Sequence, residues 1–156
     1  MQKIKTHLWF DNQAEEAARF YTSVFKNSRI VEVQRFETPE GPVPSFKIVT
    51  FELDGQEFIA LDGGPEFKFN EAISLYVDCE DQAEVDELWA KLTEGGGEPG
   101  PCGWLKDRYG LSWQIVPRRL EELIRDPDPG RAQRAMKAML AMKKIEVAEL
   151  EAAANG

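Results

Sequence analysis

The chain has 156 residues, of which 42% are hydrophobic and 30% are charged, a composition typical of a soluble globular protein with room for a substantial core. Nineteen basic residues against 28 acidic ones give a net charge of −9, which argues against nucleic acid or an anionic membrane surface as a partner. No segment has the apolar length of a membrane span or a signal peptide, and two cysteines are too few for a disulfide framework, so we expect a cytoplasmic protein.

The first part of the chain predicts the order β-α-β-β-β. Alternation in the first strand places His7 and Trp9 on one face and the apolar Leu8 on the other. A helix is expected to begin at Asn12, because Asn12 and Glu15 have the spacing of a capping box. The predicted elements, in chain order, are a strand at 3–10, a helix at 12–25, a strand at 30–36, a loop at 38–42, and strands at 45–53 and 56–61 that an Asp-Gly hairpin turn joins.

The same order recurs in the second part of the chain. A helix is predicted from Asp81, since Asp81 and Glu84 repeat the capping spacing, and three glycines at 95–97 end it. In the last strand Ser112 and Gln114 alternate with apolar neighbours and so share one face. The predicted elements are a strand at 73–78, a helix at 81–92, extended segments at 98–102 and 104–107, and a strand at 111–116.

The recurrence predicts two copies of one βαβββ unit, at about residues 1–64 and 72–117. We expect the two copies to form one domain of the α+β class, residues 1–117, in which the strands make a cup-shaped mixed sheet. Whether the copies pair within one chain or between two chains is left open by the sequence.

The rest of the chain, residues 118–156, predicts a helical extension. A short helix at 117–125 precedes a break at 126–129, and one long amphipathic helix is expected from 131 to about 153. The apolar positions of this long helix are Met136, Met139, Leu140, Ile145, Val147 and Leu150. Such a face must be buried, either on its own domain or on a second copy. Because methionine-rich faces suit adaptable interfaces, we favour a contact in a homodimer.

Seven stretches carry a resemblance to a known family, namely residues 8–11, 14–17, 20–21, 25–28, 51–58, 107–114 and 126–129. With the tandem order and the ending Asp-x-x-Gly-x-x-x-Gln, they resemble the vicinal oxygen chelate superfamily, which includes glyoxalase I, extradiol dioxygenases and bleomycin-resistance proteins. Within it the chain looks like the PhnB-like branch, often labelled demethylubiquinone 3-methyltransferase. The resemblance implies a cup-shaped sheet, a dimer and a ligand pocket inside each cup.

Metal-using members of that superfamily take ligands from the first and the last strand of each unit. The resemblance maps these positions to Lys5 (or His7), Ala60, Ala72 (or Ser74) and Gln114. Alanine has no donor atom, lysine is cationic, and the chain has a single histidine, so at most His7 and Gln114 remain. Because stable divalent sites need three or four nitrogen, oxygen or sulfur ligands, we expect no metal and no other cofactor.

Five residues are predicted to line the inner face of the cup: His7, Trp9, Phe58, Tyr76 and Gln114. An aromatic wall with few polar groups suits a flat, small apolar or aromatic ligand. The alternative is that these side chains only fill the cup, as side chains fill small barrels. His7 is expected to line the pocket, with proton transfer as an alternative, and Gln114 is a metal ligand, a donor to substrate or a group bonded to a neighbour.

Three functions are compatible with these residues. The first is a dimeric small-molecule-binding protein without a metal, and the second is a metal-dependent enzyme of glyoxalase or dioxygenase type, for which a second chain would have to supply ligands. The third is a resistance protein that sequesters its ligand. Methyl transfer is disfavoured, because no glycine-rich strand-to-helix turn is present to hold S-adenosylmethionine, and the glycines at 95–97 follow a helix. Cys102 is expected to be a free structural thiol, since no histidine is predicted beside it.

Overall fold

The computed structural model describes residues 2–38, 40 and 45–156, so most of the loop predicted at 38–42 lies outside the described residues. The chain divides into two units, Met1–Phe69 and Asn70–Gly156, and each is described by itself.

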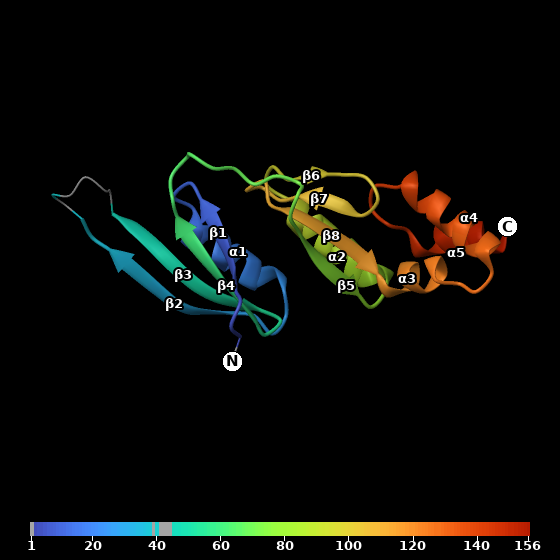
Figure 1. The fold of residues 1–156 in the computed structure, drawn as a ribbon, viewed down its shortest axis with the longest axis horizontal. Coiled ribbons are helices and arrows are strands. Elements are labelled where there is room, and N and C mark those ends of the chain that lie inside the picture. The colour runs from blue at the N-terminus through green and yellow to red at the C-terminus, as the bar shows by residue number, and fades with distance from the viewer. Residues whose placement is uncertain (1, 39, 41–44) are drawn as a thin grey trace. The chain divides into compact units, whose positions relative to one another are not determined.

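Within the described residues of unit 1, the strands form one mixed sheet (Figure 1). The strands are β1 (Thr6–Phe10), β2 (Arg29–Phe36), β3 (Phe46–Leu53) and β4 (Gln56–Asp62), in the order β1-β4-β3-β2. The first strand pairs parallel with the last, and the other pairs are antiparallel. Helix α1 (Ala14–Val24) packs on one face of this sheet, which is the β-α-β-β-β order predicted from the sequence.

The core of unit 1 lies between α1 and the sheet. The helix buries three alanines, Tyr21 and Val24 on its inner side, and alanine lets a helix approach a sheet closely. Tyr21 lies 6.2 Å from the ring of Phe51, which in turn stacks on Phe58 at 5.4 Å. This apolar layer gives the sheet one closed face.

The amino end of α1 is capped from a distant strand. Asp62, the last residue of β4, accepts hydrogen bonds from Ala14 N at 2.9 Å and from Lys47 N at 3.2 Å. Asn12 has φ +58° and lies outside the helix, whose N-cap position makes no side-chain hydrogen bond. The predicted capping box of Asn12 and Glu15 is therefore wrong, because a carboxylate brought in by strand pairing takes its place.

Glu15 instead forms a cluster of ion pairs on α1. Its carboxylate accepts from Lys47 Nζ at 2.9 Å and Arg19 Nη2 at 2.7 Å, and Arg35 Nη2 lies 3.7 Å away. The hydrogen bonds from Lys47 and Arg19 lower the pKa of Glu15 from 4.5 to about 2. The cluster ties the first turn of the helix to β2 and β3.

Unit 2, which is described throughout, repeats the topology. Strands β5 (Ser74–Cys79), β6 (Glu98–Pro99), β7 (Trp104–Lys106) and β8 (Ser112–Pro117) have the order β5-β8-β7-β6, again with the pair β5–β8 parallel. Helix α2 (Gln82–Thr93) packs on one face of this sheet (Figure 1). The prediction of two βαβββ units in an α+β fold is thus confirmed.

The predicted cap of α2 is confirmed as well. Asp81 accepts a hydrogen bond from Glu84 N at 2.9 Å, and Glu84 accepts one from Glu80 N at 2.9 Å. Here the donors and acceptors all lie within five residues, so the local sequence is enough to specify the cap.

The tail does not form the single long helix predicted at 131–153. It forms α3 (Arg118–Ile124), α4 (Pro129–Leu140) and α5 (Val147–Asn155), and α4 and α5 pack against each other. Residues 141–146 interrupt the helix because the turn before β7 holds them: Cys102 N donates to Met142 O and Gly103 N donates to Lys143 O, both at 2.8 Å.

The apolar residues of the tail are partly buried inside unit 2. Ile145, Leu150 and Ala154 are fully buried in a core with Val116 and Leu120. Met136 and Leu140 stay exposed at 44% and 62%. Packing on its own unit therefore accounts for Ile145 and Leu150, and it leaves Met136 and Leu140 uncovered.

Replacing Glu15 by glutamine removes the charge and is expected to lower the free energy of unfolding by about 1 kcal/mol at pH 7. Because the folded state lowers the pKa of Glu15, its contribution is fully present above the unfolded pKa near 4.5 and is lost as the pH falls through about 2. Urea unfolding of wild type and Glu15→Gln between pH 7 and pH 2 should therefore converge at the acid end.

The exposed neighbour Glu16 supplies the control, and Glu16→Gln should leave the unfolding free energy within about 0.3 kcal/mol of wild type. A deficit of Glu15→Gln that stays constant over this pH range would contradict the assignment.

Candidate functional site

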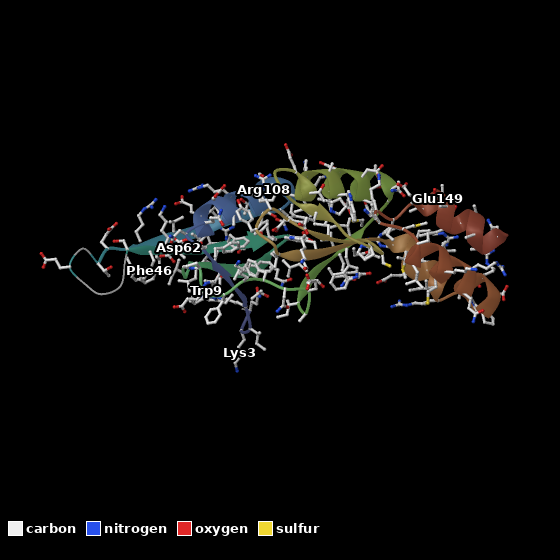
Figure 2. The ribbon with its side chains drawn as sticks, turned by 90° about the horizontal axis from the view of Figure 1, so that it is seen from above. Lys3, Trp9, Phe46, Asp62, Arg108 and Glu149 are labelled. Carbon is white, nitrogen blue, oxygen red and sulfur yellow. The ribbon has the colours of Figure 1, made fainter. Side chains whose placement is uncertain are left out.

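Each unit has a sheet face that its own helix does not cover. In unit 1 this open face carries His7 and Trp9 of β1, since strand residues alternate between the two faces and Leu8 is buried under α1. Figure 2 shows Trp9 and Phe46 on the side of the sheet away from α1. The strand register adds further open-face residues, which are Ile48, Thr50, Ile59 and Leu61.

Trp9 is held on the open face of unit 1 by its neighbours Gly63, Gly64 and Phe67. Its indole N–H donates to Gly64 O at 2.9 Å, and Phe67 packs edge-on with its ring centre 4.9 Å from that of Trp9. Gly63 lies directly against the indole, where a Cβ would be 2.2 Å from Trp9 Cε2. The indole is therefore held in one orientation and presents a fixed aromatic surface.

The rest of this face is apolar near β4 and more polar along β2, where the exposed Glu32 and Gln34 lie opposite Thr50 and Ile48. Phe36 and Phe46 stack at 4.8 Å, and Phe36 is 39% exposed. His7, the single histidine of the chain, is exposed on the same face. His7 and Trp9 thus share the face predicted from the sequence.

Phe58 does not belong to this face. It pairs in register with Thr6, is 4% exposed and stacks on Phe51 beneath α1. Its placement on the inner face is therefore wrong. Alternation in the sequence of β4 shows that two sets of residues face opposite ways, but it does not show which set faces the helix. Pairing with β1 decides that, and it places Phe58 in the set that faces α1.

The resemblance mapped the last-strand ligand position of the first unit to Ala60. Like Phe58, however, Ala60 faces the helix and is fully buried, beside Leu8. In unit 2 the residue opposite Tyr76 of the first strand is Gln114. The matching pair in unit 1 is Trp9 and Leu61. Leu61 is thus the counterpart of Gln114, and its side chain has no donor atom either.

The donor set does not fit the superfamily metal site. Of the four positions now in question, Leu61 and Ala72 have no ligand atom, and Lys5 forms an ion pair with Glu57 at 3.1 Å. Gln114 offers an amide oxygen, and the alternative positions His7 and Ser74 add one imidazole and one hydroxyl that already accepts from Gln114, so carboxylate and second histidine ligands are lacking among these positions. Among the described residues no group of three His, Cys, Asp or Glu side chains is arranged to hold a metal ion.

The open face of unit 2 is more polar. Two rows of side chains cross it in register, the first being Ser74, Ser112 and Lys106 and the second Tyr76, Gln114 and Trp104. Side chains directly opposite each other on paired strands lie about 5 Å apart. These rows therefore bring hydroxyl, amide, ammonium and aromatic groups together on one surface.

Gln114 and Tyr76 are both engaged by neighbours. Gln114 Nε2 donates to Ser74 Oγ at 3.0 Å. The hydroxyl of Tyr76 donates to Glu121 of α3, while the ring stays 48% exposed. Partial burial and then the bond to Glu121 raise the pKa of Tyr76, so this phenol stays a proton donor. The interpretation of Gln114 as a group bonded to a neighbour fits this geometry.

Beside these strands is a hollow of about 200 Å³, entirely within unit 2. Its walls include Trp104, Lys106, Ser112 and Glu71. None of these four is among the site residues predicted from the sequence. One signal was present, since Ser112 shares the predicted polar face of Gln114, but the wall residues come from three separate segments that only the fold brings together.

The turn Asp107–Gly110 before β8 has a structural role. Asp107 is 2% exposed, and its carboxylate accepts from Tyr109 N at 2.8 Å, Leu111 N at 3.1 Å and the indole N–H of Trp113 at 2.9 Å. A carboxylate with three such donors fixes both the turn and the orientation of β8.

Both cysteine thiols contact backbone carbonyls, Cys79 that of Val77 and Cys102 that of Leu140. Burial raises the pKa of the Cys79 thiol to about 12. Cys102 is half-buried at φ +57°, with Sγ 3.8 Å from Leu140 O, in the turn that holds the tail. Both thiols contribute to packing.

A family model described as 3-demethylubiquinone-9 3-methyltransferase matches residues 2–116, which span both sheets and the two helices that pack on them. The chain belongs to this family. The match ends before the tail, so it does not test the resemblance at residues 126–129.

Solved structures agree with the family. The PhnB protein of Bacillus cereus, described as a putative 3-demethylubiquinone-9 3-methyltransferase, is 40% identical over 74% of this chain and 99% of that chain, with a TM-score of 0.66. Protein PA1353 of Pseudomonas aeruginosa is 18% identical over 75% of this chain and 98% of that chain, with a TM-score of 0.59.

The fosfomycin resistance protein FosX of Listeria monocytogenes, complexed with Mn(II) and sulfate, is 17% identical over 72% of this chain and 90% of that chain, with a TM-score of 0.50. PA1353 and FosX are similar in fold alone. The family match and the PhnB protein of Bacillus cereus confirm the resemblance to the PhnB-like branch, and FosX shows that a fosfomycin resistance protein has a similar fold.

No curated protein matches the chain. Among the described residues, none of the helices combines the length and the apolar character that crossing a membrane requires.

Replacing Asp107 by asparagine should lower the free energy of unfolding by about 2–3 kcal/mol. The amide would direct an N–H either at two backbone N–H groups or at the indole of Trp113, and both arrangements leave a buried donor unpaired. Urea unfolding measures the loss, and the indole N–H signal of Trp113 in an NMR spectrum should move. Asp11→Asn, at an exposed position, is the control, and an Asp107→Asn protein as stable as this control would refute the structural role.

Proposed function

We propose that this protein of the 3-demethylubiquinone-9 3-methyltransferase family binds a flat, largely apolar small molecule on its open sheet faces and holds no resident metal. The single observation that carries the proposal is the surface around Trp9. An indole fixed by Gly63, Gly64 and Phe67 lies on a sheet face that its own unit leaves uncovered.

The open sheet faces expose large apolar side chains, among them Phe36 at 39% and Tyr76 at 48%. Monomeric proteins seldom leave a contiguous apolar surface open, and such a surface commonly marks a binding site. On unit 1 the candidate contact residues are His7 and Trp9. On unit 2 they are Tyr76 and Gln114, where a phenol and an amide supply the few polar groups that orient a ligand.

Methyl transfer, which the family description names, is not part of the proposal. The strand-to-helix turns after β1 and after β5 contain no glycine and are followed by further strands in a mixed sheet. A doubly wound parallel sheet with a glycine-rich first turn is the usual support for a dinucleotide-like cofactor. The residues of this chain therefore do not fit S-adenosylmethionine in that manner.

We also propose a cytoplasmic homodimer in which residues 1–117 act as one domain and 118–156 as its extension. The exposed pair Met136 and Leu140 on α4 supports a contact between subunits, because the two residues are one helical turn apart.

Nile red, a flat neutral dye, serves as a probe of the open faces. Trp9→Ala should weaken its binding about tenfold, since an aromatic contact contributes roughly 1 kcal/mol or more beyond simple burial. Thr50→Lys, which places a charge on the same face and keeps the indole, should weaken binding similarly. Phe20→Ala, an aromatic change on α1, should leave it unchanged. An equal loss in Phe20→Ala, or no binding by wild type, would overturn the proposal.

Native mass spectrometry after incubation with zinc, nickel or iron(II) tests the proposed absence of a resident metal and the proposed homodimer. The expected spectrum shows a dimer. None of the three metals is expected to be bound at one equivalent per subunit. One retained metal per subunit would replace the binding function with a metal-dependent enzyme, and a monomer would exclude the proposed dimer.

A further inference from the structure

The hollow of unit 2 contains a hydroxyl group without a partner. Ser112 is 1% exposed, and among the described residues its Oγ has no hydrogen-bond partner. Leaving a buried hydroxyl unsatisfied costs about 1–3 kcal/mol. Ser112 lines the hollow, so a ligand oxygen that enters and moves the wall slightly aside can satisfy this hydroxyl.

A second donor lies directly across the strand pair. Lys106 is opposite Ser112 in the register of β7 and β8, and its ammonium pairs with Glu71. An ammonium has three N–H donors, of which Glu71 occupies one. Ser112 and Lys106 both line the hollow from the same side of the strand pair, and a ligand oxygen that accepts from both complements them.

The charges around the hollow favour a neutral acceptor. Glu71 and Glu98 both line it, and Glu98 is paired in register with Lys106. Two carboxylates against one ammonium make an added anion unfavourable. A ketone or amide oxygen accepts the same hydrogen bonds without bringing a negative charge.

The walls and the volume favour a single flat ring. Trp104, Pro99 and Pro101 supply the apolar lining of the hollow. Its volume is about 200 Å³. An apolar cavity of about 150 Å³ is large enough for benzene, so a ring with one short polar substituent matches this space.

We propose that this hollow binds the carbonyl end of a neutral aromatic ketone or amide, with Ser112 and Lys106 donating to its oxygen and Trp104 packing on its ring. This inference deepens the proposed small-molecule binding and rests on it. It assigns the polar end of the ligand to the Ser112 side of unit 2.

Acetophenone, benzoate and ethylbenzene share the ring and differ in the substituent, which is a neutral hydrogen-bond acceptor, an anion and an apolar group, respectively. Comparing them shows which kind of substituent the hollow prefers. Each is titrated into the full-length ¹⁵N-labelled protein, and the amide signals of Gly100, Lys106 and Ser112 are followed. Acetophenone is expected to shift these signals and to bind at least about fivefold more tightly than the other two, the difference that one hydrogen bond makes.

Ser112→Ala should weaken acetophenone binding about fivefold and raise the unfolding temperature of the free protein, since it removes the unpartnered hydroxyl. Ser23→Ala on α1 is the matched control and should change neither. Unchanged affinity in Ser112→Ala, or tighter binding of benzoate, would overturn the assignment. Shifts confined to the residues around Trp9 would overturn it and leave the proposed function standing, whereas no shift on either face with any probe would remove both.

Discussion

The parallel pairing of the first and last strands determines how the rest of each unit is arranged. In unit 1 it sets the end of β4 beside the end of β1, where the chain turns into α1. Asp62 can therefore cap a helix that begins 48 residues earlier in the sequence. The same register decides that Ala60 and Phe58 face the helix and that Leu61 faces outward. A shift of one residue would exchange the closed and the open face.

Local patterns in the sequence predicted the elements well. Alternation placed the strands, the Asp54–Gly55 turn gave the hairpin, and Asp81 with Glu84 marked the start of α2. Each of these features depends on residues close together in the chain. For the same reason, the repeat of β-α-β-β-β could be recognised in both halves.

The errors concern interactions between distant residues. The cap of α1 comes from β4, and the face of Phe58 depends on pairing with β1. The helix predicted at 131–153 is interrupted because Cys102 and Gly103 bind the carbonyls of Met142 and Lys143. Helical periodicity continues through that segment, so the sequence alone gave no sign of the interruption. His7, Trp9, Tyr76 and Gln114 were placed on open faces, whereas the hollow beside Ser112 required the fold.

The segment at 141–146 has a consequence for how the chain folds during synthesis. Unit 1 completes its sheet once β4 is made, because all of its strands precede residue 63. Unit 2 cannot complete its core until Ile145 has been added, since this side chain is fully buried against Gly103 and the tail. During synthesis on the ribosome, all strands of the first sheet are therefore made well before the last core residues of the second unit, which stays incomplete for longer.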